Sequence, residues 1–159
     1  MASANPNMQL IERFYSAFGR RDASEMARCY HPDIKFDDPA FTNLDYLKVC
    51  AMWTMMCERG KDLRIELPTL DPTGLAATWV AHYTFSQTGR KVINRINARF
   101  EFKDGLIVRH IDQFDFYLWA RQALGLPGLL LGWTGFFKGK VQAQAMKNLT
   151  TFMARNQAR

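Results

Sequence analysis

The sequence is poor in the residues that mark metal, redox and nucleotide sites. It has three cysteines, Cys29, Cys50 and Cys57, and three histidines, and these six residues show no tight ligand spacing. The odd number of cysteines, each in a helix-like context, predicts buried apolar thiols rather than disulfides. Glycine-rich phosphate loops, internal repeats and low-complexity tracts are also absent. We therefore expect neither a metal nor a cofactor.

Long apolar runs are missing as well. The most apolar stretch, residues 124–133, is interrupted by glycine and proline, so no segment is predicted to span a bilayer. The N-terminus has no apolar core of a signal peptide. These absences predict a cytoplasmic protein with no membrane partner. A length of 159 residues with 48% apolar content predicts one domain, with a core over residues 7–122 and a helical extension over 123–159.

Acidic residues are lacking after residue 137, although the net charge is +6. The basic residues of this tail are Lys138, Lys140, Lys147, Arg155 and Arg159. A solvated helix face is the simplest interpretation. Nucleic-acid binding is disfavoured because the aromatic residues are not interleaved with the basic ones. A third interpretation, contact with an anionic surface, would show strong salt dependence.

Periodicity predicts helices first and strands afterwards. The expected helices cover residues 7–18, 22–30 and 45–59, and the expected strands cover 34–36, 63–67, 75–87, 91–103 and 106–116. Asp104-Gly105 predicts a hairpin between the last two strands. This order favours an α+β fold with helices packed on one sheet face. Helical structure is expected to resume near residue 117. The final helix has an apolar stripe that comprises Val141, Ala145, Leu149, Phe152 and Met153. This stripe is expected either to fold over the mouth of the sheet or to pack on a second subunit.

The last strand contains the strongest functional signal. Side chains alternate between the two faces of a strand, and the more apolar set of residues 106–116 includes His110 and Asp112 together with Phe114 and Phe116. Burial of an unpartnered carboxylate is costly, so Asp112 is expected to line a pocket or to join a hydrogen-bonded network. A structural His-Asp pair is the alternative. By the same alternation, neighbouring strands contribute Trp79, Tyr83, Asn94 and Phe100 to the interior face.

The order of these elements, with Asp37-Asp38-Pro39 closing a strand and His110-Ile111-Asp112-Gln113-Phe114-Asp115 ending the meander, resembles the nuclear transport factor 2-like superfamily and its SnoaL-like group. The resemblance covers residues 7–122. It implies a cone-shaped bent antiparallel sheet wrapped around N-terminal helices, which is a cystatin-like α+β barrel, here with an extra C-terminal helical segment. It also implies an apolar pocket and a homodimer.

The resemblance assigns roles residue by residue. Asp38 matches the proton-shuttling base of ketosteroid isomerases, and Asp112 matches the base aspartate of SnoaL-like cyclases. The two oxyanion donors of the isomerases fall on Phe14 and Ala98, although Tyr15 is adjacent to the first, so ordinary steroid isomerisation is disfavoured. The Arg-x-Asp pair of limonene-epoxide hydrolases is likewise missing from the comparable stretch.

Together these signals predict a cofactor-independent enzyme that removes a proton next to a carbonyl of a hydrophobic, cyclic small molecule, as an isomerase or a cyclase does. Asp112 would be the base, with His110 and Asp38 as its catalytic partners. Substrate would contact Tyr15, Trp79, Tyr83, Asn94, Phe100, Phe114 and Phe116. The alternative is a non-catalytic homodimeric module that binds an apolar ligand or another protein.

Overall fold

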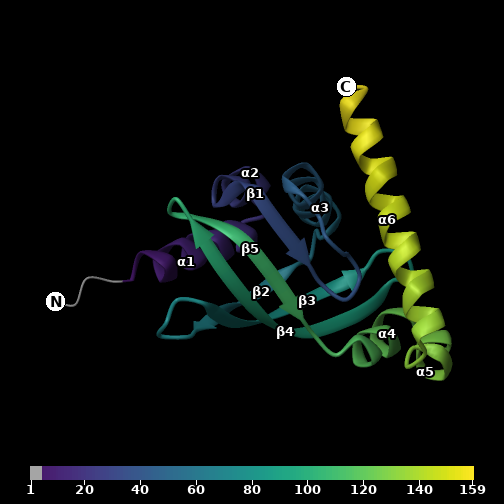
Figure 1. The fold of residues 1–159 in the computed structure, drawn as a ribbon. Coiled ribbons are helices and arrows are strands. Elements are labelled where there is room, and N and C mark those ends of the chain that lie inside the picture. The colour runs from purple at the N-terminus through teal and green to yellow at the C-terminus, as the bar shows by residue number, and fades with distance from the viewer. Residues whose placement is uncertain (1–4) are drawn as a thin grey trace.

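The computed structural model describes residues 5–159 as a strongly bent sheet with helices against its inner face (Figure 1). The strands are β1 (Tyr30–Asp37), β2 (Arg64–Leu70), β3 (Ala76–Phe85), β4 (Arg90–Lys103) and β5 (Leu106–Gln113). Their order in the sheet is β1-β5-β4-β3-β2. The strands β2 to β5 form the expected antiparallel meander, whereas β1 pairs parallel with β5. The predicted α+β class is confirmed, and the sheet is mixed rather than purely antiparallel.

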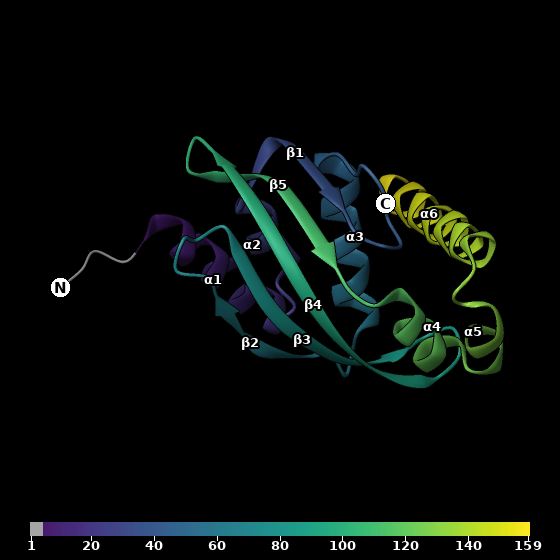
Figure 2. The same ribbon diagram turned by 60° about the horizontal axis from the view of Figure 1, so that its bottom comes forward.

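Three helices fill the inner side of the sheet (Figure 2). They are α1 (Pro6–Gly19), α2 (Ala23–Arg28) and α3 (Tyr46–Arg59). Each begins where a side-chain oxygen accepts a backbone N–H of its first turn, and these caps are Asn5, Asp22 and Asp45. The cap positions explain why the predicted helix starts agree with the structure.

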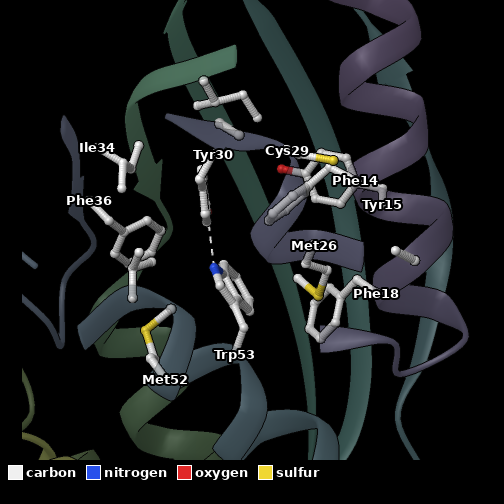
Figure 3. Close-up of a cluster of buried hydrophobic side chains, with 14 of the residues drawn as sticks. Phe14, Tyr15, Phe18, Met26, Cys29, Tyr30, Ile34, Phe36, Met52 and Trp53 are labelled. Carbon is white, nitrogen blue, oxygen red and sulfur yellow. Dashed lines mark hydrogen bonds between the residues drawn. The ribbon is translucent and has the colours of Figure 1, made fainter. Parts of the chain in front are cut away.

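The centre of the core lies between α1, β1 and α3 (Figure 3). Phe14 of α1, Phe36 of β1 and Met52 of α3 are fully buried there. Aromatic rings meet edge to face around them, as in the pair of Phe36 and Trp53, whose centroids are 5.7 Å apart. This packing holds β1 and α3 in a fixed relation to the rest of the sheet.

Several strand boundaries differ from the prediction, among them the end of β2, which lies at Leu70 rather than at residue 67. The strand β1 begins at Tyr30, although the sequence pattern placed Tyr30 at a helix end and confined the strand to residues 34–36. Pro32 is tolerated because β1 is an edge strand, where a missing N–H costs no ladder hydrogen bond. The strand β5 ends at Gln113, short of the predicted Phe116.

The early end of β5 has a local cause. Asp115 accepts a hydrogen bond from the backbone N–H of Leu118 at 3.0 Å and so caps the next helix. Phe116 is therefore the first residue of α4 (Phe116–Leu124) and not a strand residue that shares a face with Phe114.

The tail continues as α5 (Leu126–Leu131) and α6 (Gly135–Gln157), and α6 lies beside α3 (Figures 1 and 2). Leu149 and Phe152 of the predicted stripe are buried in the main core. Val141 and Ala145 are half-buried. The last helix thus covers the open end of the sheet, which was one of the two expected outcomes. Within residues 5–159, no helix is long and apolar enough to cross a membrane.

Candidate functional site

A cavity of 510 Å³ lies between the inner face of the sheet and the helices α3, α4 and α6. Its walls are mainly apolar and include Trp53, Met55, Trp79, Ala81, Ile96 and Phe114. Two carboxylic acids also line it, Asp38 and Asp112. Small-molecule sites have this composition, in which a few polar groups are set in an apolar wall.

Asp112 is 4% exposed and hydrogen-bonds a fully buried histidine. The Nε2 atom of His110 lies 2.9 Å from Oδ1 of Asp112. On the other side of the ring, Nδ1 of His110 lies 2.8 Å from the hydroxyl of Tyr30. The same hydroxyl accepts a hydrogen bond of 3.0 Å from Nε1 of Trp53, drawn as a dashed line in Figure 3. A chain of buried hydrogen bonds thus leads from α3 through β1 to the cavity wall on β5.

The direction of each hydrogen bond in this network follows from which atoms can donate. An indole nitrogen can only donate, so Tyr30 accepts from Trp53 and has its own proton free for His110. The Nδ1 atom of His110 then accepts, and its Nε2–H donates to Asp112. In this arrangement the Tyr30 hydroxyl and both ring nitrogens of His110 have partners, and Oδ1 of Asp112 accepts a hydrogen bond.

Asp38 is brought beside Asp112 by the parallel pairing of β1 with β5. Phe36 is opposite His110 and Asp37 is opposite Ile111, so Asp38 follows at the level of Asp112 on the neighbouring strand. Adjacent strands lie about 4.8 Å apart, which places two carboxyl groups at one end of the cavity. The sequence pattern contains both residues but gives no sign of this proximity.

The two carboxyl groups have different surroundings. Oδ1 of Asp38 accepts the backbone N–H groups of Ala40 at 2.7 Å and Phe41 at 2.6 Å, which leaves Oδ2 for a proton. Burial raises the pKa of Asp38 to about 7, and the nearby charge of Asp112 adds to the rise, while the backbone N–H donors oppose it. Near neutral pH Asp38 is therefore about half protonated, and Asp112 beside it is hydrogen-bonded by His110.

The remaining predicted residues divide into two sets. Trp79, Tyr83, Asn94 and Phe114 line the cavity together with the two aspartates. His110, Tyr15, Phe100 and Phe116 are not among its lining residues. His110 and Phe100 pack against each other behind the wall, with ring centroids 4.6 Å apart. Phe116 is displaced because it belongs to α4.

Two aromatic pairs add polar atoms near the cavity. The hydroxyl of Tyr83 accepts a hydrogen bond of 2.8 Å from Nε1 of Trp119, and burial raises the pKa of Tyr83 to about 12. The rings of Tyr15 and Trp79 lie 5.3 Å apart, and the hydroxyl and indole N–H of this pair have no hydrogen-bond partner among the described residues. Burial also raises the pKa of Tyr15 well above its usual value, so its hydroxyl keeps its proton.

Sequence reasoning missed Tyr30 and Trp53 as members of the hydrogen-bonded site. One signal was present for Tyr30, because residues 30, 34 and 36 share a strand face and all three are apolar or aromatic. Trp53 gave no comparable signal, since its position on the inner side of α3 also suits an ordinary core residue. Among residues 5–159 there is no cluster of three or more histidine, cysteine or acidic side chains that could hold a metal ion.

Comparison with known proteins adds a family and a fold. A family model for the SnoaL-like domain matches residues 11–110. Among solved structures, a candidate polyketide cyclase from Xanthomonas campestris pv. campestris has a TM-score of 0.64 at 19% sequence identity, over 75% of this chain and 97% of that one. A candidate isomerase from Bacillus subtilis has a TM-score of 0.64 at 14% identity, over 76% of this chain and 93% of that one.

TerC, crystallised with polyporic acid, has a TM-score of 0.58 at 19% identity, over 70% of this chain and 92% of its own. A search of curated proteins finds no match. At these identities the solved structures show the fold, which agrees with the sheet and helices described above, and the family match covers the residues that build the inner layer. The helices α4, α5 and α6 lie outside the family match.

Proposed function

Because the chain belongs to the SnoaL-like domain family, we propose that it is a cofactor-independent small-molecule enzyme that abstracts a proton next to a carbonyl group. The observation on which the proposal rests is Asp112, a carboxylate set in an apolar cavity wall and hydrogen-bonded from behind by His110. The family and its fold support a small-molecule enzyme. The reaction and the residue roles below are inferred from the cavity.

In this mechanism Asp112 accepts a proton from the carbon next to the substrate carbonyl, and an enolate forms. The neutral His110 keeps the carboxylate oriented, because it lies behind Asp112 and has no face on the cavity. Asp38, when protonated, donates a hydrogen bond from Oδ2 to the enolate oxygen. Asp38 takes the place of the donors that the family's isomerases have at the positions of Phe14 and Ala98. One such donor lowers the activation free energy by about 3 kcal/mol.

The reaction ends in one of two ways. In an isomerase, the protonated Asp112 returns the proton to a different carbon of the substrate. In a cyclase, the enolate carbon attacks a second carbonyl of the same molecule, and the new alkoxide takes the proton. Both ends leave the protein unchanged and balance without a cofactor.

The cavity supports a hydrophobic, cyclic substrate. Flat aromatic walls from Trp53, Trp79 and Phe114 suit a ring system, and Asn94 supplies a polar contact. A protein of the same fold, TerC, was crystallised with polyporic acid. The homodimer and the cytoplasmic location expected from the sequence stay predictions.

Proton abstraction is testable before the natural substrate is known. The full-length protein is incubated in D₂O with a panel of cyclic 1,3-dicarbonyl compounds and fused-ring β,γ-unsaturated ketones, and loss of the α-proton signal is followed by NMR. We expect Asp112→Asn to lower the exchange rate by at least about 100-fold, because the general base is lost.

The matched control is Asp104→Asn. Asp104 is exposed in the β4–β5 turn with a φ of 54°, a conformation that asparagine tolerates. Equal exchange by the Asp112→Asn variant and the wild type would remove Asp112 as the base. If no compound exchanges above the buffer rate while an apolar fluorescent dye still binds in the cavity, the non-catalytic binding module becomes the better interpretation.

A further inference from the structure

The short helix α5 presents its large apolar side chains to solvent. Leu126 is 65% exposed, Leu129 is 44% exposed and Leu130 is 59% exposed. Gly128 is the buried residue of this helix, and a methyl group there would overlap the carbonyl oxygen of Ala120 on α4. The close approach of the two helices requires glycine on the inner side, so the leucines are held on the outside. This is the reverse of the usual arrangement of a surface helix.

The exposed apolar surface continues past α5. Trp133 is 73% exposed and Phe136 is 75% exposed. The Nε1 atom of Trp133 donates a hydrogen bond of 3.1 Å to the carbonyl oxygen of Leu130, which keeps the indole at the end of α5. We call Leu126, Leu129, Leu130, Trp133 and Phe136 the apolar patch. Single exposed apolar residues are common, but five large ones within eleven residues of the chain are typical of a contact surface.

Basic side chains lie beside parts of the patch. Residues 116–159 contain six basic residues and no acidic one, so they account for the whole net charge of +6. The ammonium group of Lys140 lies over the ring of Phe136, 4.8 Å from its centroid. Arg90 and Arg121 line a shallow surface groove together with Leu126 and Leu129. A partner for this surface must be apolar in part and negatively charged around that part.

We propose that the apolar patch docks on the surface of a membrane that contains anionic phospholipids. The leucines and Trp133 would enter the boundary between head groups and acyl chains, where tryptophan is favoured, and the basic residues would contact the head groups. The contact is peripheral, since no described helix is long and apolar enough to span a bilayer. It replaces the sequence-based expectation that the protein has no membrane partner.

A second copy of the chain is a poorer occupant. In a symmetric dimer the same surface faces itself, so Arg121, Lys138 and Lys140 of one copy would approach those of the other with no acidic residue of the tail to pair with. An anionic bilayer instead complements both properties of the surface, its apolar centre and its positive surroundings.

Vesicle binding of the full-length protein tests the proposal. Vesicles of phosphatidylcholine alone are compared with vesicles in which about 30% of the lipid is phosphatidylglycerol, by co-sedimentation and by tryptophan emission, to which Trp133 contributes the exposed indole. We expect binding to the anionic vesicles, at least 10-fold weaker binding to the neutral ones, a blue shift of the tryptophan emission, and release as the salt concentration is raised.

Two pairs of matched variants locate the contact. Leu130→Ser combined with Trp133→Ser should weaken binding at least 10-fold, whereas Leu47→Ser, an equally exposed leucine on α3, should leave binding unchanged. Arg121→Gln combined with Lys138→Gln should weaken binding by about five-fold for each basic residue removed, whereas Lys35→Gln combined with Lys48→Gln should not. Leu126→Gln is a second patch variant should the double serine variant unfold, which circular dichroism would reveal.

The proposal is overturned if the wild type binds neither kind of vesicle, or if the patch variants bind like the wild type. It is also overturned if analytical ultracentrifugation finds a wild-type dimer that Leu130→Ser with Trp133→Ser dissociates, because the patch would then be an interface between copies. These outcomes do not depend on the reaction proposed for the cavity.

Discussion

The N-terminal and C-terminal regions of this chain differ in their charge balance and in how far their large apolar side chains are exposed. Residues 1–115 contain 15 basic and 15 acidic residues, and within the described part of this region the aromatic side chains of α1, β1 and α3 are buried except for the half-buried Tyr46. Residues 116–159 contain basic residues without acidic ones and expose leucine, tryptophan and phenylalanine around α5. The first region therefore has the surface of a self-sufficient globular fold, and the second has that of a segment with an external partner.

The cavity lies where the two regions meet. Its floor and its carboxyl groups come from the sheet and α3, while Trp119 of α4 and Val141 and Ala145 of α6 close it. The helix α6 therefore has two roles. Leu149 and Phe152 anchor it in the core, and Val141 and Ala145 complete the cavity wall. Three further experiments probe this division.

The largest effect on stability is expected from a leucine of the tail. Leu149 is fully buried in the main core, so Leu149→Ala should lower the free energy of unfolding by about 2–5 kcal/mol. Leu130→Ala, in the exposed part of the same tail, should change it by less than about 0.5 kcal/mol. Urea denaturation of both variants measures the difference. Similar values for the two would mean that α6 is not anchored in the core as described.

The second experiment concerns the pH dependence of stability. The pKa of Asp38 is raised to about 7 in the folded state, against about 3.9 in an unfolded chain. The folded protein therefore binds more protons than the unfolded one between these values, and the stabilisation from protonated Asp38 is complete below pH 4 and lost as the pH rises through 7. The full loss would be about 4 kcal/mol, and partial exposure of Asp38 reduces it to about half of that or less.

Asp38→Asn removes this titration. The free energy of unfolding of the variant, measured in urea from pH 4 to pH 8, should lack the decline that Asp38 causes in the wild type, and Asp104→Asn should retain it. In the exchange assay the wild type should lose activity above pH 7, as Asp38 loses its proton, and the variant should lose this alkaline limb. Parallel pH curves for the Asp38→Asn variant and the wild type would show that Asp38 does not titrate near neutral pH.

The third experiment concerns the hydroxyl of Tyr30. Tyr30→Phe keeps the ring but leaves Nδ1 of His110 and Nε1 of Trp53 buried without a partner. The expected cost is about 1–3 kcal/mol in the free energy of unfolding. Because His110 would no longer be fixed in one tautomer, proton exchange should also fall, with a changed pH profile. An unchanged pH profile of proton exchange in this variant would show that Tyr30 has only a structural role.

The local pattern of the sequence was sufficient for much of this description. Helical spacing of apolar residues predicted where the first three helices lie, and alternation around the Asp104-Gly105 turn placed His110 and Asp112 on the interior face of the sheet. Where the pattern misled, as at Phe116 and at Tyr30, a cap or an edge-strand proline acted against the simple period. These errors moved boundaries and did not change the fold class.

Alternation and capping are local properties, so the sequence by itself determined the class of fold, the inward direction of Asp112 and the uneven charge of the tail. The tertiary structure decided which distant residues meet. Tyr30 and Asp38 reach His110 and Asp112 through the parallel pairing of β1 with β5, and residues 80 apart in the chain hydrogen-bond as a result. Such pairing depends on how α1 and α3 pack beneath the sheet, and that packing has no local signature in the sequence. For the same reason, only the structure showed that Gly128 of α5 faces inward and that its leucines face outward.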